Sequence, residues 1–492
     1  MKRLIILCDG TWQNSLVNDD SNPSNITRIA RAILPNDERT ADEHGSQIPQ
    51  IVYYHPGIAT QNVGFWNRVF GLAAGKGIVD QIEETYAFIS SNYEPDDEIF
   101  FFGFSRGSYM VRSICGFILD FGLLTRYGMP MFVKVFEEYS KSNVPAEQNP
   151  ALNELKRQLL TVKASQTEPR LLTSDKIIVK FIGCFDTVGA LGIPKLFTWQ
   201  YDKYGFLDVK LNEKVQNARQ ALALDETRHP FVPTLWFFKD TEVNRQKCKQ
   251  VWFNGVHINI GGGNIDDAEH YSNYLGRQST VNPNTLSDGT LIWMVSEAEP
   301  FLAFDLDFLH QNIISAGTIP DGRLVGKVDQ GQNPTWFFGP IGDNYHGLGI
   351  FWKILGHGDR TAGKYSASAL ENMSWILAHF LKMVTLISPI SPISPKNRPI
   401  PESMLITNEF IHESVLYRNG PTTVGVPSGS LQGVCVGGDL SSPRFGTQIA
   451  IPVQRYNRFE EQFFQRENQN IHATRNEFMR PTMHRWYTFI FG

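Results

Sequence analysis

The sequence lacks the features that mark several large classes of protein. Its five cysteines are scattered and include no CxxC pair. Because most of them lie in apolar runs, we interpret them as small core residues of a protein from a reducing compartment, not as disulfides or zinc ligands. Basic residues are not in excess: 45 Lys and Arg face 50 Asp and Glu, for a formal net charge of −5. This balance argues against a nucleic-acid partner, since no basic stripe is available to neutralise phosphates.

Long apolar runs are also absent. No stretch reaches the roughly 18 uncharged apolar residues of a membrane span, and the closest, 375–390, contains His379 and Lys382. The apolar run before Asp9 is too short for the hydrophobic region of a signal peptide. We therefore expect a cytoplasmic protein with neither a signal peptide nor a transmembrane helix.

Motifs for bound nucleotides and metals are incomplete. The glycine-rich stretch GLAAGKG (71–77) has glycine where a phosphate-binding loop requires serine or threonine. No HExxH or paired His/Cys cluster occurs, and the acidic stretch GGGNIDDAEH (261–270) is typical of an exposed loop. We expect no cofactor and no metal.

The hydrophobic pattern predicts an α/β fold. Continuous apolar runs at 2–8, 50–54 and 99–102 alternate with amphipathic segments at 25–34 and 78–93. Runs that are apolar throughout, with no polar alternation, are typical of parallel strands covered on both faces by helices. Further strands are predicted at 176–186 and 246–257.

The stretch GFSRG (103–107) lies where a buried strand turns into a helix. Gly103 and Gly107 would permit a sharp elbow that projects the Ser105 hydroxyl above the sheet, next to the positive end of the helix dipole. GxSxG alone is a weak signal, but its strand–turn–helix context favours a nucleophile. The alternative is a simple helix N-cap.

An activated serine needs a base, and the base needs an acid that lies between the two in chain order. Asp186 qualifies as the acid because it ends the apolar run IIVKFIGCFD and precedes a turn. Its alternative role is a local hydrogen bond to the backbone. The competing acid, Asp225, lies in the helix-like run ALALDE and resembles a structural residue.

His257 is the favoured base among twelve histidines, because it ends the predicted strand QVWFNGVH and precedes the glycine-rich loop INIGGGN. The alternative is an ordinary core histidine. His229 is the second candidate, and His357 and His412 are weaker because no strong strand leads into them.

An oxyanion needs backbone N–H donors, one from the residue after the nucleophile and one from a loop after an early strand. These requirements predict Arg106 and the CDGT loop, with Gly10 and Thr11. The same loop is compatible with a tight turn capped by Asp9.

Six ordered motifs carry a resemblance to a known family: LIILCDGTWQN, GLAAGKGI, FFGFSRGSYMVRSICGFI, FIGCFDTVGALGIP, ALALDETRHPFVPTLW and QVWFNGVHINIGGG. The chain resembles the α/β-hydrolase domain family of type VI secretion phospholipase effectors, which also has stand-alone members in fungi. The resemblance implies an α/β-hydrolase fold and a triad of Ser105, Asp186 and His257, the residues favoured above.

Residues 1–300 are predicted to form the catalytic core, with a helical insertion at about 129–170. Residues 301–400 are predicted to form a cap region and 401–492 a section packing on the core. An apolar helix at 375–386 would line the cap or contact lipid, although plain core is the commoner role.

We expect an ester hydrolase for lipid-like or apolar acyl substrates, with peripheral membrane contact and no nucleic-acid partner. The alternatives are an idle binding or scaffold protein with the same fold, or an acyltransferase or lactone hydrolase with the same triad.

Overall fold

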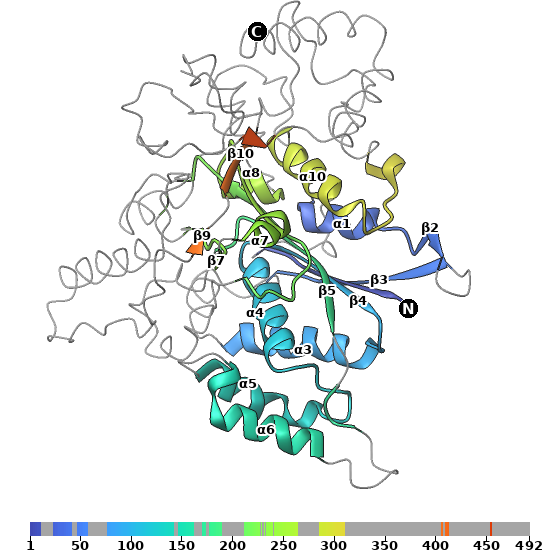
Figure 1. Ribbon diagram of the computed structural model, residues 1–492. Coiled ribbons are helices and arrows are strands. Elements are labelled where there is room, and N and C mark those ends of the chain that lie inside the picture. Colours follow the sequence, from blue (N-terminus) through green and yellow to red (C-terminus); the bar gives the residue numbers. More distant parts are fainter. Residues whose placement is uncertain are drawn as a thin grey trace, which may run out of the picture.

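The computed structural model describes most of the first 309 residues and three short segments nearer the carboxyl end (Figure 1). The described residues are 1–10, 23–41, 47–57, 76–141, 146–161, 170–173, 177–188, 211–226, 228, 231, 233–239, 241–263, 285–309, 405–406, 409–412 and 453–454.

Nine strands of the described residues form one sheet in the order β11-β10-β8-β6-β5-β4-β1-β3-β2. Every neighbouring pair is parallel except β2 with β3. The strands are β1 (Arg3–Cys8), β2 (Asn36–Ala41), β3 (Gln47–His55), β4 (Glu98–Phe104), β5 (Ile178–Phe185), β6 (Ala218–Ala223), β8 (Cys248–Phe253), β10 (Glu409–His412) and β11 (Val453–Gln454). A separate antiparallel pair joins β7 (Phe238–Lys239) and β9 (Leu405–Ile406).

The register aligns the carboxyl ends of the central strands. Gly103 of β4 pairs with Cys8 of β1 and with Cys184 of β5. Phe185 of β5 in turn pairs with Ala221 of β6. Residues that directly follow these strands therefore lie along one edge of the sheet, where parallel α/β folds place their functional loops.

Helices cover both faces of the sheet (Figure 1). They are α1 (Asn25–Ala32), α3 (Lys76–Asn92), α4 (Arg106–Asp120), α5 (Phe132–Lys141), α6 (Pro150–Thr161), α7 (Glu242–Lys247), α8 (His257–Gly261) and α10 (Thr285–Ala298), with 3₁₀ turns η2 (Met129–Met131) and η3 (Ala146–Gln148). None of these described helices combines the length and the apolarity that crossing a membrane requires.

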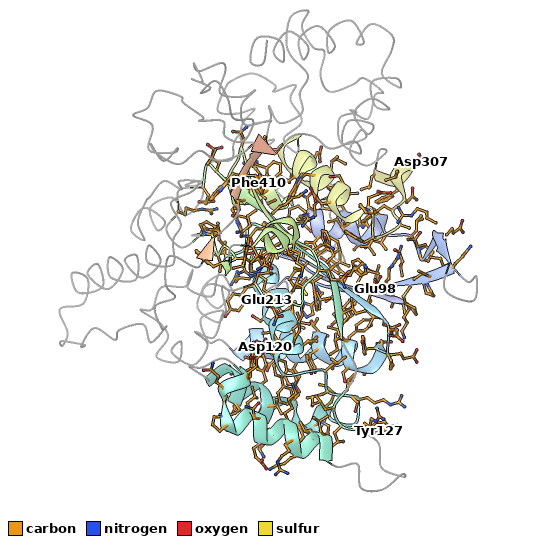
Figure 2. All side chains as sticks on the ribbon, viewed as in Figure 1. Glu98, Asp120, Tyr127, Glu213, Asp307 and Phe410 are labelled. Carbon is orange, nitrogen blue, oxygen red and sulfur yellow. The ribbon has the colours of Figure 1, made fainter. Side chains whose placement is uncertain are left out.

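The pleat of the strands divides the core into two apolar clusters. On β1, Leu4 and Ile6 pack in a cluster with α3, α4, α5 and α6, whereas Ile5 and Leu7 pack in a second cluster with α1 and α10. Successive strand residues point to opposite faces, so a strand buried on both sides must be apolar at every position. This requirement explains the unbroken apolar runs, and Figure 2 shows side chains filling the space on both sides of the sheet.

The structure differs from the sequence-based expectation in two segments near the carboxyl edge. The run ALALDE was predicted to be helix-like, but its first part belongs to β6, whose six residues are all buried between neighbouring strands. Tertiary burial overrides the helix propensity of alanine and leucine here. His257 was predicted to end a strand, but β8 ends at Phe253 and His257 begins α8.

The predicted division into regions stays a prediction, although several of its segments are visible. The 129–170 segment contains α5 and α6, which lie beyond α4 from the sheet (Figure 1). Phe410 of β10, labelled in Figure 2, packs against the second apolar cluster. The predicted helix at 375–386 lies outside the described residues.

Candidate active site

Ser105 occupies a strained turn between β4 and α4. Its backbone has φ 56° and ψ −120°, a conformation that costs a non-glycine residue on the order of 1–3 kcal/mol. The Ser105 side chain makes no capping hydrogen bond to α4, so the N-cap alternative does not describe its contacts. Its backbone N–H donates to the carbonyl of Phe185 at 3.0 Å, which fixes the turn to the end of β5.

The two glycines of the GFSRG motif make this turn sterically feasible. A Cβ atom on Gly103 would lie 2.5 Å from Cα of Ser108, one turn into α4. A Cβ atom on Gly107 would lie 2.1 Å from the carbonyl oxygen of Cys8 at the end of β1. Any side chain at either position would push the helix away from the strands, so α4 can begin directly against the sheet only with glycine there.

Asp186 directly follows β5 and is fully buried. Its own backbone has φ 40°, and its N–H donates to the carbonyl of Ala221 at 2.8 Å. One carboxylate oxygen, Oδ1, accepts the N–H of Ala223 at 3.0 Å. The other, Oδ2, lies 2.6 Å from Nδ1 of His257. The backbone of β6 thus orients a carboxylate whose second oxygen faces the imidazole.

His257 lies between Ser105 and Asp186. Its Nε2 is 2.8 Å from Oγ of Ser105, opposite the Nδ1 contact with Asp186. Because a carboxylate only accepts hydrogen bonds, the Nδ1 contact places the imidazole proton on that nitrogen. The lone pair of Nε2 is then directed at the serine hydroxyl.

The position of His257 at the start of α8 depends on a tight turn. Gly255 adopts φ 116°, and Oδ1 of Asn259 accepts the backbone N–H of Val256 at 3.1 Å. This cap starts a short helix immediately after the turn. The segment INIG was predicted to be a flexible loop, and it is instead one helical turn that holds the imidazole in place.

The surroundings of the imidazole favour its neutral form. Its ring centroid lies 4.8 Å from that of Phe104 and 4.9 Å from that of Phe231. Burial lowers the pKa of His257 from its usual value, and this effect outweighs the opposing hydrogen bond to Asp186. A neutral imidazole at neutral pH can accept a proton, as a general base must.

The predicted oxyanion donors are only partly described. Arg106 is the first residue of α4, where backbone N–H groups have no acceptor within the helix. The N–H of Gly10 donates to Oδ1 of Asp9 at 2.7 Å, which is the capped turn that the sequence also allowed. A Cβ atom on Gly10 would lie 2.5 Å from the ring of Phe104, so this loop approaches the elbow closely. Thr11 lies outside the described residues.

Asp9 has more partners than the sequence indicated. Its Oδ2 accepts hydrogen bonds from Ser24 at 2.5 Å, Tyr54 at 2.8 Å and Thr27 at 3.2 Å. Burial raises the pKa of Asp9 despite these bonds. No local pattern predicted this cluster, because its donors come from two segments, the start of α1 and β3, that are both separate from Asp9 in the chain.

The competing candidates are either structural or outside the described residues. Oδ2 of Asp225 accepts the N–H of Gly255 at 2.7 Å and so supports the turn before His257. His229 and His357 lie outside the described residues, and His412 ends β10. In the part of the chain that is described, no group of three or more His, Cys, Asp or Glu residues could hold a metal ion.

The chain resembles proteins of bacteria and yeast. It is 26% identical over 365 residues to the uncharacterized protein YEL023C of Saccharomyces cerevisiae; the match covers 68% of this chain and 49% of the yeast protein. The chain therefore spans about half the length of that curated relative.

Two solved structures are more distant. A Tle1 effector bound to the VgrG spike of the type 6 secretion system is 16% identical, with 62% of this chain and 74% of that chain covered and a TM-score of 0.34. An uncharacterized protein from Pseudomonas aeruginosa is 15% identical, with 66% and 48% covered and a TM-score of 0.32.

A protein-family model matches the first part of the chain. Residues 2–297, more than half of the chain, match the family described as the catalytic domain of Tle1-like phospholipase effectors of the type VI secretion system. That span includes the GFSRG elbow, Asp186 and His257. The chain thus belongs to the Tle1-like phospholipase effector catalytic domain family, whose function at the family level is the hydrolysis of lipid esters.

Proposed function

We propose that the protein is a serine-dependent carboxylic ester hydrolase that acts on lipid-like substrates. The observation that carries this proposal is the continuous chain from Oγ of Ser105 through His257 to the buried carboxylate of Asp186, with contacts of 2.8 and 2.6 Å. The strained backbone of Ser105 adds support, because strain of this kind persists where the surrounding structure enforces it and is concentrated at functional sites.

The chemistry follows from these contacts. Oγ of Ser105 attacks the ester carbonyl carbon, and its proton passes to Nε2 of His257 as the new C–O bond forms. The carboxylate of Asp186 stabilises the imidazolium and keeps the ring oriented. When the tetrahedral intermediate collapses, the ester C–O bond breaks and His257 returns the proton to the departing alcohol oxygen. Water then repeats the sequence on the acyl-enzyme and releases the carboxylic acid.

The negative oxygen of each tetrahedral intermediate needs preorganised donors. We assign this role to the backbone N–H of Arg106, at the positive end of α4, together with a donor of the Gly10–Thr11 loop other than the N–H of Gly10, which donates to Asp9. Gly10 supports the assignment because it packs directly against Phe104, the residue before the nucleophile.

Membership in a phospholipase effector family favours a lipid ester as the substrate. The aromatic ring of Phe231 beside the imidazole would suit an apolar acyl chain. A substrate in a bilayer would require peripheral contact with the membrane surface.

A fluorophosphonate probe tests the nucleophile directly. We expect one covalent adduct, located on Ser105 by mass spectrometry, and no adduct in Ser105→Ala. Ser113→Ala is the matched control, because Ser113 lies on the same helix and its hydroxyl bonds only locally, to the carbonyl of Tyr109. An adduct on another residue, or equal labelling of Ser105→Ala, would overturn the assignment. Release of fatty acid from phospholipid vesicles and from short-chain esters then tests the substrate class.

A further inference from the structure

A second carboxylate, in addition to that of Asp186, contacts His257. Glu226 follows β6 and is fully buried. Its Oε2 accepts the backbone N–H of His257 at 3.2 Å. Asp186 therefore orients the ring of His257, while Glu226 holds the backbone from which that ring projects.

Arg228 holds Glu226 in turn. Nε of Arg228 donates to Oε1 of Glu226 at 2.8 Å, and Nη2 donates to Oε2 at 2.7 Å. The backbone N–H of Arg228 donates to Oε1 as well, at 2.9 Å. This two-pronged geometry fixes the plane of the carboxylate as well as its distance.

Phe231 completes the arrangement. The guanidinium carbon of Arg228 lies 3.7 Å from the centroid of the Phe231 ring, whose plane is at 69° to that of the His257 imidazole. The DETRHPF segment (225–231) thus contacts His257 twice, at its backbone through Glu226 and at its ring through Phe231.

A contribution to stability does not by itself explain the Glu226–Arg228 ion pair, because apolar residues of similar volume often stabilise a core equally well. Its location suggests a different reason. The Glu226 charge raises the pKa of His257 and the Arg228 charge lowers it, so the two members of the pair act on the base in opposite directions. Asp186 is the remaining charged group with a described effect on the imidazole.

We propose that Glu226, Arg228 and Phe231 form a histidine clamp, a set of positioning residues that fix the backbone and the ring of His257 against Ser105. The proposal rests on the proposed function, since it assigns these residues a role in orienting the base. The clamp touches neither the hydroxyl nor the ester, and it acts only through His257.

The test compares Glu226→Gln with Glu226→Ala. Glutamine keeps an oxygen that can accept the His257 N–H, so kcat at alkaline pH should stay within about threefold of the wild type. Alanine removes that acceptor and should lower kcat by about 10- to 100-fold with little change in KM, because small displacements of a catalytic group are costly. In Glu226→Gln the Arg228 charge is no longer balanced, so the acidic limb of kcat/KM should move to lower pH.

Glu297→Gln is the matched control. Glu297 is a buried carboxylate that pairs with Arg219, near the amino end of β6, at 2.5 Å. Its replacement should lower stability and leave the pH profile unchanged. A profile of Glu226→Gln that coincides with that of Glu297→Gln would overturn the clamp, as would folded Glu226→Ala with wild-type kcat.

A readout independent of turnover separates this inference from the proposed function. The imidazole of His257 can be titrated by NMR in histidine-labelled protein, with the signal assigned by its loss in His257→Gln. We expect its pKa to fall in Glu226→Gln and to stay unchanged in Glu297→Gln. If the wild type neither hydrolyses esters nor reacts with the fluorophosphonate, the proposed function fails, and the titration still decides whether the clamp controls His257. An unchanged titration in Glu226→Gln overturns the clamp alone.

Discussion

Polar groups are buried at both ends of the strands of the central sheet. We call the side where the parallel strands begin the amino edge and the side where they finish the carboxyl edge, and the charge states of the polar groups differ between the two. At the carboxyl edge, a neutral imidazole lies between the Ser105 hydroxyl and the Asp186 carboxylate, and two of the backbones involved have positive φ. At the amino edge, guanidinium and carboxylate groups meet in direct ion pairs. The comparison contrasts buried polar groups to which we assign a catalytic role at one edge with buried ion pairs that hold strands together at the other.

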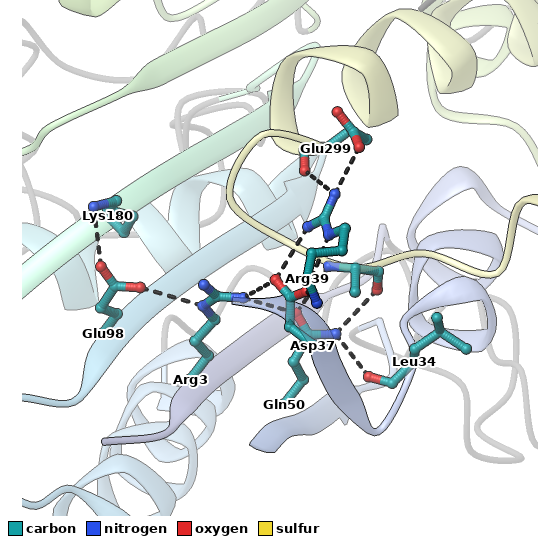
Figure 3. Close-up of polar contacts among 9 residues, drawn as sticks. Arg3, Leu34, Asp37, Arg39, Gln50, Glu98, Lys180 and Glu299 are labelled. Atoms are coloured by element: carbon teal, nitrogen blue, oxygen red, sulfur yellow. Dashed lines mark hydrogen bonds and ion pairs between the residues drawn. The ribbon is translucent and has the colours of Figure 1, made fainter. Parts of the chain in front are cut away.

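The amino-edge network joins side chains of β1, β2, β4 and β5 (Figure 3). Arg3 of β1 pairs with Asp37 of β2 at 2.6 Å and with Glu98 of β4 at 3.3 Å. Glu98 also pairs with Lys180 of β5 at 3.0 Å, and Arg39 pairs with Asp37 at 3.0 Å. Each charged group has a partner of opposite sign close by, so we expect none of these groups to take part in proton transfer. The contrast with the carboxyl edge yields five predictions.

The largest expected effect is the loss of hydrolysis when the serine hydroxyl is removed. Ser105→Ala should lower kcat by about 10⁵- to 10⁶-fold, the size of the effect in hydrolases with a Ser-His-Asp triad. Amino-edge contacts are untouched, so the free energy of unfolding should change by less than about 1 kcal/mol. Ester hydrolysis and urea denaturation measure the two quantities. Residual activity within tenfold of the wild type would contradict the role of Ser105.

Replacement of the orienting acid should have the next largest effect. Asp186→Asn should lower kcat by about 10⁴-fold, because the amide can stabilise the wrong imidazole tautomer. Asp186→Asn should also shift the dependence of activity on pH. Activity needs the unprotonated imidazole, so it falls as the pH drops through the lowered pKa of His257. Asp186 raises that pKa, and without its charge the acidic limb should move to still lower pH. A limb that moves to higher pH would argue against Asp186 as the partner.

The amino edge should show the reverse pattern, with a loss of stability and unchanged kcat. Asp37→Asn should lower the free energy of unfolding by about 3 kcal/mol, because it leaves buried arginine charge poorly compensated. Glu38→Gln, at an exposed neighbouring residue, should change it by less than about 0.5 kcal/mol. Denaturant titrations of both variants, with ester hydrolysis as a parallel assay, measure the difference.

The stability contributed by Asp37 should also depend on pH. Burial of Asp37 disfavours its charge, but the hydrogen bonds from Arg39 and Arg3 prevail and lower its pKa. The folded state therefore binds a proton less readily than the unfolded state, and the contribution is complete above the ordinary aspartate pKa of about 3.9. It should be lost as the pH falls below that value toward the lowered pKa. Asp37→Asn should lose less stability over this acid range than the wild type.

The smallest expected effect concerns the strained backbone of Ser105 at the carboxyl edge. Ser105→Gly should be about 1 kcal/mol more stable than Ser105→Ala, because glycine adopts positive φ without a Cβ penalty. At Ser113, inside α4, the order should reverse, with glycine less stable than alanine by about 1 kcal/mol. Thermal unfolding of the four variants measures both differences. Equal stability of Ser105→Gly and Ser105→Ala would argue that the turn stores no strain.

The sequence predicted the central part of the site because local patterns carry it. The GFSRG turn and Asp186 both follow unbroken apolar strands, and parallel strands present their carboxyl ends at one edge. These patterns led to Ser105, Asp186 and His257 as candidates, which the structure brings within hydrogen-bonding distance. Their catalytic roles stay proposals until the labelling and kinetic tests are made.

The remaining features depend on contacts between distant segments, which local patterns do not encode. The Ala- and Leu-rich sequence of β6 is typical of a helix, and only its position between β5 and β8 identifies it as a strand. Glu226 was part of a recognised motif, but its bond to the backbone of His257 depends on that misread strand. If β6 had been predicted as a strand, its carboxyl end would have been expected at the same edge of the sheet as the ends of β4 and β5. Glu226, which follows β6, would then have been expected near the site.

The pairing of β8 with β10 has a consequence for how the chain folds. Trp252 pairs with Ile411, so the strand that leads into the His257 turn completes its hydrogen bonds only with a segment far along the chain. During synthesis, β8 is an edge strand until that segment emerges, and an unpaired edge invites pairing with other chains. Contacts so distant in sequence also slow folding. A fragment that ends near residue 300 would keep the candidate catalytic residues, and we expect it to aggregate through the exposed edge of β8.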